Sequence, residues 1–209
     1  MVPTINSAVR DIFGPGSQLE IRHVQTYEEM AKKVEYLKGL GFKIVLTMGT
    51  FDLLHIGHAR YLERAKQRGD ILIVGIDSDE KVRTRKGTYR PIVPQDERLE
   101  VLAHVRHVDL LFVKNLNDPH WQLLKTIRPD VLIATSTTYK PDQLEALKEF
   151  CGEVVILEPQ STTRTTARIR EMLVKHGTEV LEKLDETSKK VVDQLDEVKQ
   201  FAKQLLGGD

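Results

Sequence analysis

Residues 43–58 read KIVLTMGTFDLLHIGH, and this stretch decides the fold. Residues 43–48 form a short apolar run of the kind found in a buried parallel strand. The run passes through Gly49 into a turn, and a helical pattern follows as far as Lys66. A helix that starts directly after such a strand turns its free backbone amides and the positive end of its dipole towards one crevice. The stretch therefore predicts a strand–turn–helix unit with an anion-binding site at the turn.

The same alternation continues through most of the chain. Further short apolar runs with the length of buried strands lie at residues 71–76, 108–113, 131–134 and 154–157. Helical patterns lie at residues 26–40, 95–104, 119–127 and 141–150. This order predicts an α/β fold, a Rossmann-like parallel sheet of about five strands with helices on both faces. Since ligands bind at the carboxyl ends of such strands, we expect the chemistry after Met48, Ile76 and Ala134.

Capping residues mark where two of these helices start. Thr26 is followed three residues later by Glu29, which is the pattern of a capping box. Asp118 precedes Pro119, and proline is favoured at the first position of a helix. We therefore expect helices that start immediately after Thr26 and Asp118.

The two ends of the chain do not follow the alternation. Residues 1–24 contain prolines and glycines that interrupt any long element, and we interpret them as an N-terminal arm. Residues 177–209 read as a C-terminal amphipathic helix. Its seam residues recur three and four apart: Leu181, Leu184, Ser188, Val191, Leu195, Val198, Ala202 and Leu205. Two interpretations stay open, a coiled coil with a second copy, which would make a homodimer, and a helix packed on its own domain.

The composition is that of an ordinary soluble globular protein. Of the 209 residues, 40% are hydrophobic and 30% are charged, and 31 basic residues balance 31 acidic ones. A neutral chain gives no reason to expect a nucleic-acid or membrane-surface partner. No apolar run is long enough to span a bilayer, and no secretion signal opens the chain. The single cysteine, Cys151, excludes an internal disulfide and a Cys-based zinc site, so we expect a cytoplasmic protein.

His55 and His58 are the strongest chemical signal. They lie three residues apart at the predicted helix start, so their side chains share nearly one face of the first turn. Gly57 between them lets a phosphate approach the backbone closely. Imidazoles in this position can donate hydrogen bonds to phosphate oxygens. Two surface histidines or a metal pair are the alternatives, but no third ligand lies at useful local spacing, and we expect no protein-held metal.

A basic segment follows the second predicted strand. Residues 77–87 are expected to form a loop over the same crevice, and the segment contains Lys81, Arg83, Arg85, Lys86 and, just beyond it, Arg90. In a neutral protein such a cluster suits a triphosphate or a phosphorylated substrate. The alternative is an ordinary solvated basic loop. Hydroxyl residues gather at 161–166, ahead of another helical pattern, and hydroxyls at a helix start also suit phosphate.

From about residue 24 to residue 174 the sequence resembles the nucleotidyltransferase superfamily that carries an H-x-G-H signature, in its cytidylyltransferase-like branch. Within that branch it is most similar to the adenylyltransferase domains of ADP-heptose synthases and next to glycerol-3-phosphate cytidylyltransferases. The helical pattern before the first strand, residues 87–92 and residues 139–142 favour the heptose type. The resemblance implies a nucleotidyltransferase domain over residues 25–176.

The resemblance also implies site residues. His55, His58, Lys86 and Arg98 would act on the phosphates during catalysis. The nucleotide would be bound by Gly49, Thr50, Phe51, Asp52, Gly57, Asp77, Arg83, Arg85, Arg164, Thr165 and Thr166. A second register of the hydroxyl-rich motif, over residues 161–163, stays open. The implied substrates are ATP or CTP with Mg²⁺ and a phosphorylated sugar or polyol, and the implied product is pyrophosphate.

Three other functions share parts of this pattern. An FMN adenylyltransferase would use the same site on another acceptor. A nucleotide-binding regulatory or scaffold protein would use the heptad segment as its working part. The H-x-G-H tetrapeptide also occurs in class I aminoacyl-tRNA synthetases, but this chain lacks a Lys-Met-Ser-Lys-Ser segment.

Overall fold

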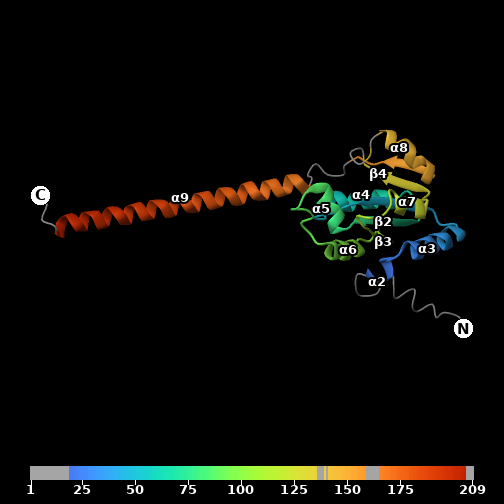
Figure 1. The fold of residues 1–209 in the computed structure, drawn as a ribbon, viewed down its shortest axis with the longest axis horizontal. Helices are drawn as coiled ribbons and strands as arrows, with labels where there is room; N and C mark the ends of the chain where they lie inside the picture. The colour runs from blue at the N-terminus through green and yellow to red at the C-terminus, as the bar shows by residue number, and fades with distance from the viewer. Residues whose placement is uncertain (1–18, 136–138, 140, 159–164, 206–209) are drawn as a thin grey trace. The chain divides into compact units, whose positions relative to one another are not determined.

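The computed structural model describes residues 19–135, 139, 141–158 and 165–205, and Figure 1 shows their elements. The chain divides into two compact units, residues 1–162 and 163–209. The first unit carries the sheet and the candidate site. The second is formed by one helix, and the two units are described separately below.

The first unit is built on a five-stranded parallel sheet. Its strands are β1 (Ile44–Gly49), β2 (Ile71–Asp77), β3 (Leu110–Lys114), β4 (Val131–Ala134) and β5 (Glu153–Ile156). They lie in the order β3-β2-β1-β4-β5. The predicted α/β fold with a Rossmann-like sheet is confirmed. The order of connection reverses between β1 and β4, so the crevice of this sheet lies outside the carboxyl ends of β1, β2 and β4.

Helices cover both faces of the sheet. The helices of the first unit are α2 (Leu19–Arg22), α3 (Tyr27–Gly39), α4 (Ile56–Lys66), α5 (Asp79–Lys86), α6 (Gln95–Ala103), α7 (Gln122–Ile127) and α8 (Pro141–Leu147), with a short 3₁₀ helix, η1 (Lys148–Phe150). One core joins α4 and α6 to the sheet, and a second core on the other face joins α3 and α7. Alternate residues of β1 supply each core, Val45 the first and Ile44 and Leu46 the second.

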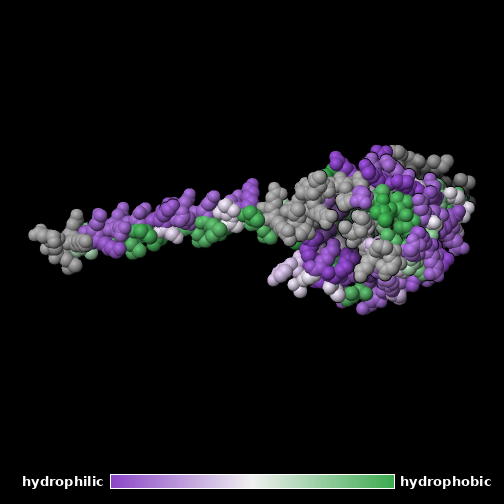
Figure 2. Space-filling view, turned by 90° about the horizontal axis from the view of Figure 1, so that it is seen from above, coloured by the Kyte–Doolittle hydropathy of each residue, from purple (hydrophilic) through white to green (hydrophobic). Residues whose placement is uncertain are grey.

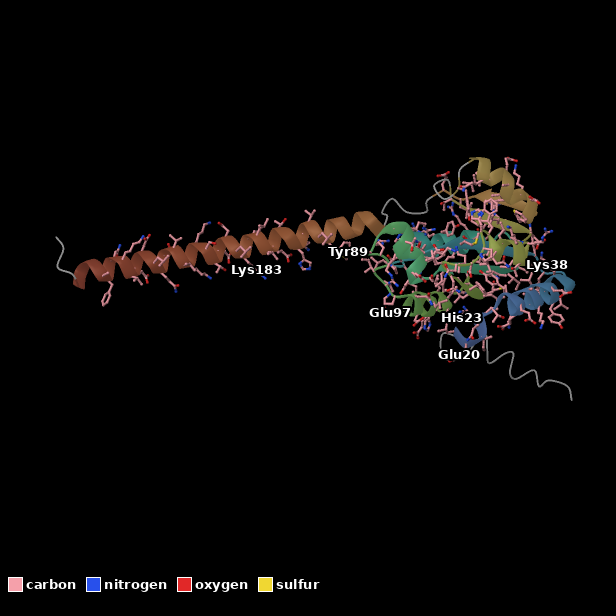
Figure 3. All side chains as sticks on the ribbon, viewed as in Figure 1. Glu20, His23, Lys38, Tyr89, Glu97 and Lys183 are labelled. Carbon is pink, nitrogen blue, oxygen red and sulfur yellow. The ribbon has the colours of Figure 1, made fainter. Side chains whose placement is uncertain are left out.

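On the second face of the sheet, α7 contacts both α3 and β2. Lys38, labelled in Figure 3, donates hydrogen bonds from the last turn of α3 to the carbonyls of Ile127 and Arg128, where α7 ends. Gly75 in β2 leaves room for α7, because a Cβ there would lie 2.5 Å from Cδ2 of Leu123. Thus α7 packs closely against β2 and is tied to the end of α3.

Two local predictions are wrong. Residues 79–86 form the helix α5 and no loop, because Ser78 accepts a hydrogen bond from the Lys81 amide at its start. Acidic residues in its first turn and basic residues in its last turn complement the helix dipole. The helix predicted from Pro119 begins only at Gln122, since the Asp118 carboxylate accepts from the Asn115 amide and the Tyr27 hydroxyl and caps nothing.

Part of the predicted N-terminal arm packs on the domain. Val24 is fully buried, and its amide donates to the carbonyl of Leu111 in β3. Arg22 donates to the carbonyls of Ala103 and Val108. Residues 19–24 therefore belong to the sheet unit. Residues 1–18 lie outside the described residues.

The second unit is formed by α9 (Thr165–Leu205), a helix of 41 residues. It starts well before residue 177, and the heptad seam occupies its later part. The predicted boundary between residues 176 and 177 falls inside this helix. Figure 2 shows hydrophobic residues recurring along one side of α9 and hydrophilic residues along the other. The hydrophobic side chains described on it are exposed, with Leu181 at 67% and Leu195 at 55%.

No helix in the described part of the chain is both long and apolar enough to cross a membrane.

Candidate active site

The turn after β1 holds a strained backbone around a buried carboxylate. Phe51 and Leu53 have φ values of 51° and 52°, in the left-handed region that side-chain-bearing residues rarely adopt. Asp52 between them is 3% exposed. Its carboxylate accepts hydrogen bonds from the amides of Ile92 and Val93 at 3.0–3.1 Å. The same carboxylate forms an ion pair of 2.9 Å with Arg90. Asp52 thus fastens the turn to the segment ahead of α6.

His55 and His58 form the cap of α4. His55 is the N-cap residue, and its Nδ1 accepts a hydrogen bond of 3.0 Å from the Gly57 amide. The amide of His55 in turn donates to Nδ1 of His58 at 3.4 Å. The two rings stack with centroids 4.0 Å apart, and the Phe51 ring meets His58 edge-on. Imidazoles here fill the places that a hydroxyl and a carboxylate occupy in an ordinary capping box.

This cap fixes the tautomer of both imidazoles. A nitrogen that accepts a hydrogen bond carries no proton, so the proton of each neutral ring lies on Nε2. Burial, assisted by the charges of His55 and Lys86, lowers the pKa of His58 to about 4. His58 is therefore neutral at pH 7. The pair offers two Nε2–H donors at a helix N-terminus, which suits the oxygens of a phosphate group.

A buried carboxylate at the end of β2 pairs with two cations. Asp77 forms an ion pair of 2.8 Å with Lys114 and one of 2.7 Å with Arg85. The carboxyl is desolvated, yet Lys114, Arg85 and Lys81 hold its pKa below the ordinary value. Arg85 also donates to the Thr50 hydroxyl at 2.9 Å, which brings the last turn of α5 to the turn after β1.

Lys86 lies beside this cluster in the last turn of α5. Desolvation of its ammonium group and the charges of Arg85 and Arg90 lower the pKa of Lys86. The electrostatic interaction of Lys86 with His58 shows that the two groups share one environment. An anion bound there would relieve the repulsion among these cations.

Arg98 occupies the base of the site as a structural clamp. Its guanidinium donates to the carbonyls of Thr50, Asp77 and Val93 at 2.7–3.0 Å and pairs with Asp79 at 2.7 Å. The residue is 2% exposed. In this structure Arg98 touches protein groups, and it joins the ends of β1 and β2 to the segment before α6. A direct contact of Arg98 with phosphate stays a prediction.

The remaining predicted residues divide by position. Gly49 ends β1, and Gly57 is buried in the first turn of α4. Arg83 is exposed on α5. Arg164 lies outside the described residues, and Thr165 and Thr166 begin α9, where only the backbone is described. The structure thus brings together the predicted site residues that lie at the ends of β1 and β2 and on α4 and α5.

Sequence reasoning missed Lys114, Tyr61 and the position of Tyr139. Lys114 ends β3, and the rule that strand ends carry chemistry would have singled it out. The Tyr61 and Thr47 hydroxyls hydrogen-bond at 2.7 Å. Burial, assisted by Tyr61 and Asp77, raises the pKa of Tyr139 to about 12, so the Tyr139 hydroxyl lies near both of these residues. No sequence spacing brings these residues together, because they come from different elements.

The carboxylates of the site do not fit the role of magnesium ligands. Asp52 is bound to two amides and Arg90, and Asp77 to two cations. Within the described ranges, no three His, Cys, Asp or Glu side chains form a group that could hold a metal ion.

Solved structures share the fold. A lipopolysaccharide core biosynthesis protein from Thermoplasma volcanium is 24% identical with a TM-score of 0.51, and the match covers 57% of this chain and 98% of that one. A pantoate-beta-alanine ligase from Francisella tularensis complexed with a β,γ-ATP compound and β-alanine is 16% identical with a TM-score of 0.52, and the match covers 68% of this chain and 67% of that one. At these identities the likeness shows the architecture alone.

Curated relatives are closer in sequence. The bifunctional protein HldE of Pseudomonas aeruginosa is 40% identical over 156 residues, which is 72% of this chain and 33% of that protein. HldE of Aliarcobacter butzleri is 39% identical over 150 residues, which is 71% of this chain and 31% of that protein. The chain spans about a third of the length of these relatives. The profile of the cytidylyltransferase-like family matches residues 46–205, from β1 to the end of α9, and the chain belongs to that family.

Proposed function

We propose that this protein transfers a nucleotidyl group from a nucleoside triphosphate to a phosphorylated sugar. The preferred pair is ATP with a sugar 1-phosphate, as the resemblance to ADP-heptose synthases implies. The observation that carries the proposal is the histidine pair, whose Nδ1 atoms are both bound by backbone amides. Two fixed Nε2–H donors at the end of β1 suit the α-phosphate of a nucleotide.

The reaction is an in-line displacement at the α-phosphorus. A phosphate oxygen of the acceptor forms the new P–O bond, while the bond from the α-phosphorus to the oxygen bridging to the β-phosphate breaks. That oxygen leaves with the electron pair as part of pyrophosphate. The acceptor phosphate is already an anion, so no base is needed and no enzyme nucleophile takes part. Catalysis consists of alignment and stabilisation of charge.

Each group at the site has a separate task in this proposal. His55 and His58 donate from Nε2 to oxygens on the α-phosphorus, where charge grows in the transition state. Lys86 and Arg85 neutralise the departing pyrophosphate. Asp52 and Arg98 hold the surrounding segments, as their bonds to backbone groups indicate.

Magnesium enters as part of the substrate. Because both carboxylates at the site are bound to protein groups, we assign Mg²⁺ to the phosphate oxygens of the triphosphate, which it commonly prefers to protein ligands alone. A free thiol at Cys151 and the proposed nucleotide substrate support our assignment of the reaction to the cytoplasm. The acceptor is a small molecule, and we assign no nucleic-acid or membrane partner.

The first test is pyrophosphate release. ATP, CTP, GTP and UTP are each combined with Mg²⁺ and a panel of sugar phosphates, polyol phosphates and FMN. The proposal expects turnover with ATP and a sugar 1-phosphate and a loss of about two or more orders of magnitude in His55→Ala. Lys32→Ala, on the exposed face of α3, is the matched control and keeps the wild-type rate. CTP with a polyol phosphate, ATP with FMN, or tight binding without turnover would each contradict the proposed pair.

We further propose that α9 pairs with α9 of a second copy. Its seam is hydrophobic and exposed, with Leu184 at 57% and Val198 at 64%. Ion pairs such as Lys189–Asp185 lie within one helix and leave the seam uncharged. A helix of this length keeps such a stripe in water only when a partner covers it.

Light scattering tests this pairing. The full chain is expected at twice its own mass, and Leu195→Lys on the seam is expected to convert it to a monomer. Glu186→Lys, on the polar side of the same helix, is the matched control and stays dimeric. A monomeric wild type, or a dimer that survives Leu195→Lys, would overturn the pairing.

A further inference from the structure

We propose that Lys114 is a positioning residue that neutralises Asp77 and so releases Arg85 to bind the β- and γ-phosphates of the nucleotide. This inference rests on the proposed function. It assigns a role to a residue that carries none of the family's signature.

Asp77 is shared between two cations in different settings. Lys114 pairs with Oδ1 and Arg85 with Oδ2. The Lys114 side chain is 14% exposed, whereas the Arg85 side chain is 53% exposed. Lys114 is therefore confined to the carboxylate, while Arg85 can exchange it for a ligand in the solvent-facing crevice.

The sheet itself places Lys114 opposite Asp77. The two residues are register partners at the carboxyl ends of β3 and β2. The Ser78 amide donates to the Lys114 carbonyl at 2.9 Å and extends the pairing by one step. The sheet therefore holds Lys114 in place. Arg85 lies in the last turn of α5 and would move with the end of that helix.

The charge balance at Asp77 decides which of its two cations can leave the carboxylate. A buried carboxylate with one cationic partner holds it strongly, since separation leaves an uncompensated charge. With Lys114 in place, Asp77 stays neutralised when Arg85 leaves. Desolvation lowers the pKa of Lys114, while Asp77 acts against this and favours the charged form.

Arg85 is already placed for this exchange. One of its nitrogens, Nη2, contacts both Asp77 and the Thr50 hydroxyl, in the turn that leads to the histidines. Lys86 lies next along α5. A ligand that reaches the histidines through its α-phosphate would present its outer phosphates to these cations. The inference therefore concerns a triphosphate and leaves a monophosphate unaffected.

The test compares ATP with AMP. Binding of each, with Mg²⁺ present, is measured by calorimetry on the full chain and on Lys114→Met, Lys114→Arg and the double variant Asp77→Asn/Lys114→Met. In Lys114→Met, Asp77 retains Arg85, so ATP affinity is expected to fall about tenfold while AMP affinity stays within about twofold. Lys114→Arg is expected to keep most of the ATP affinity. The double variant is expected to recover ATP affinity relative to Lys114→Met, because the competing acid is gone.

Recovery in the double variant separates positioning from structure, since a merely structural lysine would not be rescued by removing its partner. Equal losses for ATP and AMP, unchanged ATP affinity in Lys114→Met, or no recovery would each overturn the inference. If Lys114→Met does not fold, Asp77→Asn is compared with the double variant, and equal ATP affinity is expected. A tenfold weaker double variant would then overturn it.

Failure of this inference is distinguishable from failure of the proposed function. A wild-type chain that releases pyrophosphate, paired with a Lys114→Met variant of unaltered ATP affinity, removes only the role of Lys114. A wild-type chain that neither binds ATP nor turns it over removes both.

Discussion

Lowering the pH from 7 to 5 is expected to destabilise the sheet unit through His58. The folded chain lowers the pKa of His58 from 6.5 to about 4, so the unfolded chain binds the proton more readily. The contribution is complete above the unfolded value and is lost as the pH falls towards 4. A difference of about 2.5 pKa units corresponds to roughly 3 kcal/mol, of which about 2 kcal/mol is lost between pH 7 and pH 5.

The loss has a structural cause. Protonation would place a hydrogen on Nδ1 of His58, which accepts from the His55 amide. The cap of α4 would then lose one acceptor, and a charge would be buried beside Lys86.

Chemical denaturation at both pH values, on the wild type and on His58→Gln, measures this effect. Glutamine keeps an acceptor at the third helical position and does not titrate. The other titrating groups, His23 among them, are common to both proteins, so the difference between their losses isolates His58. We expect the wild type to lose about 2 kcal/mol more than the variant. Equal losses in the two proteins would refute the buried, neutral histidine.

Three further substitutions test the packing around the site, each by denaturation. Asp52→Ala leaves two amides and Arg90 without their acceptor and is expected to cost about 3–5 kcal/mol and to reduce turnover, whereas a stable, fully active variant would contradict the fastening role. Arg98→Met is expected to cost a similar amount, about 3–5 kcal/mol, since Asp79 stays partly buried, and a loss below about 1 kcal/mol would argue against a clamp. Gly75→Val is expected to cost about 1–3 kcal/mol by displacing Leu123, with unchanged stability as the contrary result.

The fold could be predicted from sequence because its signals are local. Buried parallel strands are short apolar runs, and the helix caps are short motifs, as at Thr26, whose hydroxyl accepts from the Glu29 amide. The helix start predicted after Asp118 was wrong because that side chain has a distant partner. The Asp118 carboxylate is bound by Tyr27, which lies 91 residues away along the chain. No local pattern at residue 118 carries that information.

The candidate site could likewise be predicted from the sequence only in part. His55 and His58 could be chosen from their spacing, but their role as the cap of α4 could not, because imidazoles rarely serve as capping groups. The basic segment was expected to form a phosphate-binding loop over the crevice, whereas residues 79–86 form the helix α5 and Asp77 pairs with Arg85 in its last turn. Lys114 enters only through strand register, which depends on how β3 lies beside β2.

The left-handed residues Phe51 and Leu53 have a consequence for the conformational entropy that the site loses when it binds a ligand. Glycine would adopt the same φ values without strain, and it would also let the turn sample other shapes between encounters. Side chains at both positions narrow that sampling, and the bonds of Asp52 hold the one shape that remains. The turn is thus ordered before an anion arrives, so little conformational entropy is lost on binding. An anion therefore binds to a turn that is already rigid. Only the long basic side chains at the end of α5 need to change conformation when it binds.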